Sequence, residues 1–421
     1  MVEKIYSDIV RESCLKYVHP CGVTVYMYPM EKRSASAQFA VKFGSMDNRY
    51  RLKGGELAEI PDGTAHYLEH KLFESEEKDA FALFAQTGAS CNAGTSYEST
   101  VYYFTAADNF EKNLEILLGF VGDPYFTPET VEKERGIISQ EITMYEDNPN
   151  WRVIMELLKG IYSENPIRTD IAGTVESISH ITDKLLYELY DVFYNPANMY
   201  LCVAGGFDPD KVIEICERCL KDRPAIEFES VPIDEPREVS ESYREVSMPV
   251  GKPLFAIGFK RPDAADAKAA LEDYISYNTI LDCLFGESSE FFARHRESGL
   301  INDAFRASVF TARTVVLPYI TGESDDPETL LVEIKKELRR AKAEGIPESD
   351  FKRIKKVNYG GMLRSYNHVE NTASGMVFSA LSGLSPFSMI ESAANADYAT
   401  ALEKLAELDE DNVCLAVVNP L

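Results

Sequence analysis

Hydrophobic and polar positions along the chain follow two alternating patterns, and the same order of patterns occurs in both halves. Apolar residues in short runs or at every second position predict strands, whereas apolar residues spaced three or four apart predict helices. In the first half the expected elements are a strand at 36–43, helices at 61–74 and 77–87, a strand pair at 90–106, helices at 108–123, 127–147, 150–162 and 183–196, a strand at 199–207 and a helix at 208–222.

The second half repeats this order of strand, helices, strand pair, helices and strand. Residues 224–245 separate the halves with three prolines and many acids, a composition that is typical of a linker. We therefore expect two similar α+β domains at 1–225 and 246–421, joined by a linker at 226–245. The expected elements of the second half are strands at 243–248 and 253–259, helices at 264–285 and 288–298, strands at 303–310 and 313–320, helices at 326–344, 347–366, 370–382 and 397–407, and a strand at 413–419.

The composition favours a soluble protein whose partners are neither nucleic acids nor membranes. The 421 residues carry a formal net charge of −26, and a surface this acidic repels phosphate backbones and anionic lipids. No apolar run approaches the ~18 residues of a membrane span, and the first residues lack the apolar segment of a signal peptide. Eight scattered cysteines are typical of reduced thiols. We expect a cytoplasmic protein.

The candidate chemistry begins at the stretch GTAHYLEHKLF, where His66, Glu69 and His70 lie within five positions of a chain that has only six histidines. On a helix, residues four apart project from one face, so both imidazoles can reach one metal ion. Glu69 is placed to take a proton from water as a general base, and the order H-x-x-E-H is a metallopeptidase signature. The alternative is a chance pair of histidines on a core or surface helix.

A catalytic metal site of this kind needs a third protein ligand. The helix expected at 127–147 offers Glu134 and Glu141, which are seven residues apart and therefore share a face. They are also about 10 Å apart along the helix axis, which is too far for both to reach one ion. One should bind the metal and the other should orient a ligand, and the spacing does not decide which. Solvated helix charge is the alternative for either residue.

Three segments together resemble the pitrilysin or insulinase family of inverted-zincin metallopeptidases, which includes the mitochondrial processing peptidase. They are HYLEH at 66–70, GASCNAGTSYESTVYYF at 88–104 and EKERGIISQE at 132–141. The resemblance covers nearly the whole chain and is closest to the bacterial members of the YmfH type. It implies a pair of homologous α+β domains, each a mainly antiparallel sheet packed with helices, with the zinc motif in the first domain alone.

The resemblance also implies the metal and the residues that bind it. One zinc ion per chain is expected, with His66, His70 and Glu141 as its ligands. Glu69 is expected to be the general base, and Glu134 is expected to complete the catalytic set by supporting the ligands.

Substrate is expected on an edge strand beside the zinc, at Asn92 and Ala93. In the family a peptide adds to this edge as a further strand, so main-chain pairing holds many sequences. The small residues of SCNAGT suit such a close approach of another backbone. An ordinary buried strand is the alternative.

Further substrate contacts come, in the family, from an Arg and, seven residues later, a Tyr of the second domain or of a companion subunit. The matching stretch here is FFARHRESGLIND. Seven residues after Arg294 stands Ile301, and seven after Arg296 stands Asp303, so neither partner is a Tyr. With Arg294 as a substrate contact, we expect either a heterodimer with a homologous subunit that supplies the Arg and Tyr, or a homodimer. The alternative is that another tyrosine, such as Tyr319, takes this place.

The expected function is hydrolysis of peptide bonds, in peptides or small unfolded proteins, by a zinc metalloendopeptidase that needs a companion subunit. A second hypothesis is an assembly or peptide-binding subunit that binds zinc but has little proteolysis of its own. A third is a metal-dependent lyase or small-molecule hydrolase, because a related fold carries the same inverted motif. The two-domain length and the stretch NAGTS argue against the third hypothesis.

Overall fold

The computed structural model describes residues 1–75, 79–224 and 226–421, and the chain divides into two compact units. Each unit has its own hydrophobic core. Unit 1 contains residues 1–142, 170–232 and 363–389, and unit 2 contains residues 143–169, 233–362 and 390–421. The units are not contiguous halves of the chain. Segment 143–169, from the first half, belongs to unit 2, and segment 363–389, from the second half, belongs to unit 1. The contiguous domain boundaries given above stay a prediction.

Unit 1 is built on a seven-stranded sheet with the order β1-β2-β3-β9-β4-β8-β7. Among its described strands, β3 and β9 are the parallel pair, and the other neighbours are antiparallel. No expected element covers the first three strands, and β1 has little hydrophobic pattern because it is exposed along most of its length. The strands are β1 (Val2–Ser7), β2 (Glu12–Val18), β3 (Thr24–Pro29), β4 (Ala35–Val41), β7 (Ser90–Thr95), β8 (Thr100–Ala106) and β9 (Met199–Gly205).

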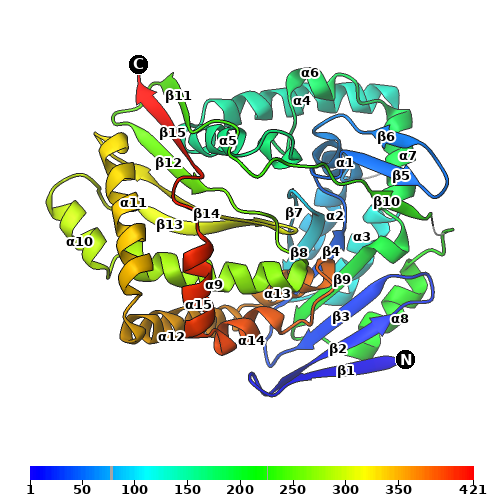
Figure 1. Ribbon diagram of the computed structural model, residues 1–421. Helices are drawn as coiled ribbons and strands as arrows, with labels where there is room; N and C mark the ends of the chain where they lie inside the picture. The colour runs from blue at the N-terminus through cyan, green and yellow to red at the C-terminus, as the bar shows by residue number, and fades with distance from the viewer. Residues whose placement is uncertain (76–78, 225) are drawn as a thin grey trace. The chain divides into compact units, whose positions relative to one another are not determined.

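Unit 2 is built on a five-stranded sheet with the order β11-β15-β12-β14-β13 (Figure 1). This order matches β3-β9-β4-β8-β7 of unit 1 strand for strand, and in both sheets the first of these pairs is parallel. The equivalence confirms the α+β fold with two similar, mainly antiparallel sheets. The strands are β11 (Tyr243–Met248), β12 (Leu254–Phe259), β13 (Arg306–Ala312), β14 (Val315–Glu323) and β15 (Val413–Pro420).

Two helices explain why the units exchange segments. Helix α5 (Pro149–Ile161) packs on β12 and β15 of unit 2, and its Val153, Leu157 and Ile161 form a buried stripe at a spacing of four. Helix α13 (Val369–Leu381) packs on β4 and β9 of unit 1, where Gln38 Nε2 of β4 donates to the carbonyl of Glu370 at 3.2 Å. Each exchanged segment therefore belongs to the unit whose sheet buries the apolar face of its helix.

The other helices correspond to helices that the hydrophobic periodicity predicts, except that no expected element covers residues 175–178 or 388–395, which form helices α6 and α14. The helix expected at 77–87 begins outside the described residues, and its described part is α2. The helices are α1 (Thr64–Leu72), α2 (Ala80–Thr87), α3 (Phe110–Val121), α4 (Pro128–Glu146), α6 (Val175–Ile178), α7 (Asp183–Phe193), α8 (Pro209–Cys219), α9 (Ala267–Phe285), α10 (Glu290–Glu297), α11 (Pro327–Glu344), α12 (Glu348–Ser365), α14 (Ser388–Asn395) and α15 (Tyr398–Glu407).

The segment expected as a linker contains regular structure. Strand β10 (Phe228–Ser230) pairs with β5 (Arg49–Leu52), which pairs with β6 (Leu57–Glu59) in a small three-stranded sheet of unit 1. In unit 2, the carboxylate of Glu235 accepts hydrogen bonds from the backbone N–H groups of residues 163–165 at 2.7–2.9 Å. Backbone pairing and a capped loop therefore order parts of this acidic, proline-containing stretch.

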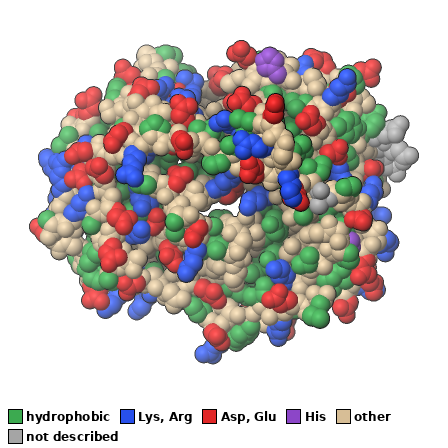
Figure 2. Space-filling view, turned by 45° about the vertical axis from the view of Figure 1, so that its right-hand side comes forward, with side chains coloured by type: hydrophobic (Ala, Val, Ile, Leu, Met, Phe, Trp, Pro, Cys, Tyr) green, Lys and Arg blue, Asp and Glu red, His purple; other side chains and the backbone are tan. Residues whose placement is uncertain are grey.

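The surface carries charges of both signs. Figure 2 shows acidic and basic side chains interspersed over the face that it displays. Many of them form pairs along helices, as where Arg340 of α11 contacts both Glu337 and Glu344. None of the helices in the described part of the chain has the length and apolar character that crossing a bilayer requires.

Candidate metal centre

Helix α1 carries all three residues of the H-x-x-E-H stretch, and its start requires a glycine. Gly63 has φ 89°, in the left-handed region, and a Cβ there would lie 2.3 Å from the carbonyl oxygen of Ala172. The helix that follows is almost entirely buried. The spacing of four brings His66 and His70 together with ring centroids 4.5 Å apart, and Glu69 beside them is only 8% exposed.

Helix α4 brings its two glutamates to different nitrogen atoms of the histidines. Glu141 Oε2 lies 3.4 Å from His70 Nε2, and Glu141 Oε1 lies 3.8 Å from His66 Nε2. Glu134 Oε1 instead contacts His70 Nδ1 at 2.9 Å. Glu141 therefore faces the Nε2 atoms of both rings, and Glu134 holds the opposite side of one ring. The spacing of the two glutamates along the chain had left this distinction open.

The arrangement fits a catalytic zinc ion. The possible ligand atoms of His66, His70 and Glu141 all lie within 4.8 Å of one another. Tetrahedral zinc with bonds of about 2.0–2.2 Å places its ligand atoms roughly 3.3–3.6 Å apart, and the two Nε2–carboxylate distances here are 3.4 and 3.8 Å. Two imidazoles and one carboxylate leave a fourth position for water or substrate, as catalytic zinc requires. A carboxylate on the second ring nitrogen, here Glu134, is the usual support of a ligating imidazole.

The two histidines prefer opposite protonation states in the metal-free protein. Burial lowers the pKa of His66, and the neighbouring His70 lowers it further. Burial alone would also lower the pKa of His70, but hydrogen bonds with Glu134 and Glu141 outweigh burial and raise this pKa to about 10. The hydrogen bond with His70 also lowers the pKa of Glu141. Without metal, His70 is therefore the protonated ring and His66 the neutral one.

An NMR titration of metal-free protein labelled with 13C-histidine should show this asymmetry directly. We expect His70 to keep its proton through neutral pH, up to about pH 10, and His66 to be neutral from well below the usual imidazole range. A raised pKa means that the proton is bound at neutral pH, so zinc must displace it on binding.

The matched variants for this titration lie on α4. Glu134→Gln removes the carboxylate at His70 Nδ1 and should lower the His70 pKa. Glu129→Gln changes an exposed carboxylate in the first turn of the same helix and should leave that pKa unchanged. Titration of His70 near the unperturbed value of about 6.5 would contradict the prediction.

Glu69 is a buried carboxylate with one well-defined partner. Thr95 Oγ1, on β7, donates to Glu69 Oε2 at 2.7 Å. Burial raises the pKa of Glu69, and the Thr95 hydrogen bond together with the charge of His70 lowers it in part. A carboxyl group with a raised pKa holds a proton taken from water better than an exposed glutamate does. The sequence did not indicate Thr95, because the two residues are 26 positions apart and on different elements.

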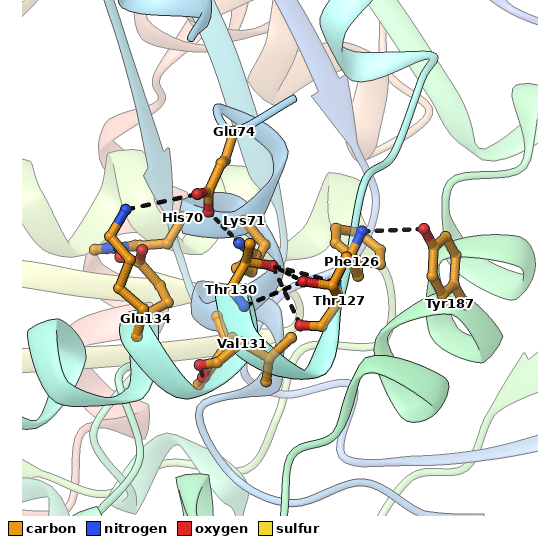
Figure 3. Close-up of polar contacts among 11 residues, drawn as sticks. His70, Lys71, Glu74, Phe126, Thr127, Thr130, Val131, Glu134 and Tyr187 are labelled. Atoms are coloured by element: carbon orange, nitrogen blue, oxygen red, sulfur yellow. Dashed lines mark hydrogen bonds and ion pairs between the residues drawn. The ribbon is translucent and has the colours of Figure 1, made fainter. Parts of the chain in front are cut away.

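A second set of contacts ties α1 to α4 beside the histidines (Figure 3). Lys71 is fully buried and donates to Glu74, whose other oxygen lies 3.5 Å from Lys133 Nζ on α4. A buried ammonium requires a paired carboxylate, so Glu74 is held at the end of α1, next to the turn of α4 that carries Glu134. The sequence did not predict this set, because a Lys and a Glu three positions apart look like a solvated helix pair.

A cavity of about 550 Å³ opens beside Glu69 and His70 in unit 1. Asn92 lines it from β7, which is the edge strand of the sheet. Ala93, the next residue, is half-buried and packs against the core. The edge strand thus lies beside the histidines, and the substrate contacts of Asn92 and Ala93 stay predictions. The lining residues are Glu69, His70, Phe73, Glu74, Ser75, Asp79, Phe81, Asn92, Lys133 and Glu134.

The stretch that carries Arg294 runs through α10 of unit 2 and beyond its end, and Arg294 is exposed in the last turn of this helix. Ile301, seven residues later, is only 3% exposed and belongs to the core of that unit, so it is not available to a substrate. Arg296 forms an ion pair with Asp303 at 2.7 Å. A substrate contact of Arg294 stays a prediction.

Comparisons with known proteins agree with one another. The family description "Insulinase (Peptidase family M16)" matches residues 29–175, and "Peptidase M16 inactive domain" matches residues 180–358. The Bacillus subtilis protein named "Uncharacterized zinc protease YmfH" is 38% identical over 421 residues, which cover 98% of this chain and 96% of its own. Human mitochondrial-processing peptidase subunit beta is 28% identical over 213 residues, 48% of this chain and 44% of its own. The crystal structure of an M16-like peptidase from Alicyclobacillus acidocaldarius matches with a TM-score of 0.93 at 34% identity, covering 97% of this chain and 98% of that one.

Proposed function

Because this chain belongs to the insulinase family of peptidases, family M16, we propose that it is a zinc metalloendopeptidase that cleaves peptides or small unfolded proteins. One observation carries the proposal: His66, His70 and Glu141 converge with their ligand atoms within 4.8 Å of one another, and Glu69 stands next to them at the wall of a cavity. We propose one zinc ion per chain, held by these three ligands.

In the proposed mechanism, Glu134 supports a zinc ligand and Glu69 transfers a proton. Glu134 contacts His70 Nδ1, which leaves His70 Nε2, on the side of Glu141, as the atom that would bind the ion. When bound, zinc supplies a Lewis acid that polarises the scissile carbonyl and makes water a stronger nucleophile. Glu69 takes a proton from the attacking water and passes it to the leaving amine. Because Glu69 is buried, its carboxyl group holds that proton more readily than an exposed glutamate would.

We propose that the substrate binds as an additional strand along β7. Ser90, Asn92 and Gly94 are the exposed residues of this edge strand. Strand β7 is the last strand of its sheet, where it pairs with β8, so its other edge is open to pairing among the described strands. A Cβ built on Gly94 meets no described atom within 4 Å, so the face of the strand is also open at this position. Main-chain pairing selects an extended conformation more than a sequence, which favours peptides and unfolded segments over folded proteins.

A zinc-binding and peptide-binding subunit with little proteolysis of its own is the second candidate function. One observation favours it: no Tyr stands seven residues after Arg294 or Arg296. We reconcile both candidates by proposing that a homologous companion subunit supplies the Arg and Tyr. The human relative is likewise named as a subunit of its peptidase.

The test is cleavage of a quenched peptide library by the zinc-loaded chain, alone and with a homologous subunit that lacks the zinc motif. Alone, as monomer or homodimer, the chain should cleave slowly. The companion should raise kcat/KM at least tenfold, since one well-placed contact to the developing oxyanion contributes about 3 kcal/mol. Full activity of the isolated chain, undiminished by Arg294→Ala, would exclude the need for a companion. Peptide retention without turnover, with the companion present, would favour the binding subunit.

A further inference from the structure

The general base Glu69 is held by a residue of the neighbouring strand. Thr95 Oγ1 donates to Glu69 Oε2 at 2.7 Å, in a place where Glu69 is only 8% exposed and water competes little. We propose that Thr95 is the positioning residue of Glu69, whose hydroxyl fixes the carboxylate so that the other oxygen, Oε1, is presented to the attacking water. This inference rests on the proposed peptidase function and extends it to a residue outside the H-x-x-E-H stretch.

Thr95 is itself held in place by the hairpin that carries it. It stands directly opposite Thr100 in the antiparallel pairing of β7 and β8, and the two Oγ1 atoms are 3.5 Å apart. Thr100 is fully buried and donates to the carbonyl of Phe43 at 2.9 Å. By strand alternation, Thr95 lies on the same face as Cys91 and Ala93, which pack against the core. The hydroxyl that meets Glu69 therefore projects from a rigid strand.

A carboxylate at this position needs such a partner. Glu69 is only 8% exposed, so few water molecules can take the place of a hydrogen-bond partner for its carboxylate. Rotation of a free carboxylate would also spread its two oxygens over many orientations, whereas a base must lie within hydrogen-bond reach of its proton. A hydrogen bond to an ionised group is among the stronger ones, so one hydroxyl can restrain this rotation. Since β7 is also the proposed substrate strand, the same strand places both the base and the peptide.

The experiment compares three variants of the full chain. Thr95→Val keeps the shape of the side chain and removes the hydroxyl, and Thr95→Ser keeps the hydroxyl. Thr105→Val is the matched control, since Thr105 lies on β8 of the same hairpin and its buried hydroxyl has no hydrogen-bond partner among the described residues. With zinc-loaded protein and a quenched peptide, Thr95→Val should lower kcat about tenfold and leave KM within about twofold. Thr95→Ser and Thr105→Val should keep most of the kcat, and all three should retain zinc.

A second readout does not depend on activity. In metal-free protein at pH 8, the thermal midpoints of wild type, Thr95→Val, Glu69→Ala and the double variant form a double-mutant cycle. Thr95→Val should lower the midpoint by a few degrees when Glu69 is present and change it little when Glu69 is replaced. Thr105→Val should shift the midpoint equally in both backgrounds.

The two readouts separate two kinds of failure. If wild type cleaves no peptide but the cycle shows coupling, the peptidase function fails while Thr95 still holds Glu69. If wild type cleaves and Thr95→Val retains wild-type kcat, or affects kcat no more than Thr105→Val does, Thr95 is not a positioning residue. A cycle without coupling would overturn the inference in either case.

Discussion

Replacing Glu69 by glutamine is expected to lower kcat for peptide cleavage by about 10²–10⁴-fold, the range that general acid–base catalysis contributes. Glutamine keeps the shape of the side chain and can still accept the hydrogen bond from Thr95 through its amide oxygen. It cannot take a proton from water at neutral pH. Zinc content and thermal stability should therefore stay close to those of wild type, and the loss should appear in kcat.

The control for this experiment is Glu129→Gln, the same change at an exposed position in the first turn of α4. It should leave the rate unchanged. Cleavage by Glu69→Gln at the wild-type rate, with the peptide and zinc concentrations held constant, would exclude Glu69 as the base. A loss of zinc in Glu69→Gln would mean that Glu69 takes part in metal retention instead.

The second large effect concerns the metal. His66→Ala should abolish zinc retention after dialysis, because two remaining protein ligands bind zinc too weakly. Glu141→Gln should weaken zinc binding, since a neutral amide replaces the carboxylate that faces both Nε2 atoms. Glu134→Gln should weaken it less, by about 10–100-fold, as expected for a group that supports a ligand from behind. Metal content by elemental analysis and competition with a chelator would measure the series.

His180→Ala is the matched control for this series, because His180 is an exposed histidine of the same unit. It should retain zinc as wild type does. If Glu134→Gln lost all metal while Glu141→Gln kept it, the roles of the two glutamates would be reversed. Full zinc retention by His66→Ala would exclude the proposed ligand set.

Much of the fold follows from hydrophobic periodicity. The buried stripe of α5 and the buried strands β4 and β12 stand out in the sequence because most of their core-facing positions are apolar. The repeated order of elements also indicated two similar sheets. Strand β1 was not predicted, because a strand that is exposed along most of its length lacks the alternating apolar pattern that indicates a strand.

The exchange of 143–169 and 363–389 between the units was not predicted either. An amphipathic helix shows which of its faces is apolar, but its sequence does not say which sheet will cover that face. Helices α5 and α13 therefore looked like members of their own halves, although each packs on the sheet formed by the other half of the sequence. Chain order is a weak guide to packing when two sheets have equivalent shapes.

The sequence by itself determined the chemistry of the candidate site. His66 and His70 are four residues apart, so a helix through them puts both side chains on one face. Glu69 directly precedes His70, so the same helix also places its carboxylate beside them. The tertiary structure alone decided which glutamate of α4 faces both rings, because that depends on how α4 lies across α1. It also decided that Thr95 meets Glu69 and that Lys71 is buried against Glu74. The contacts of Glu141 and Thr95 join side chains of different elements, and the burial of Lys71 comes from the elements that pack over it. The distance between two packed elements is not encoded in the spacing of residues along either one.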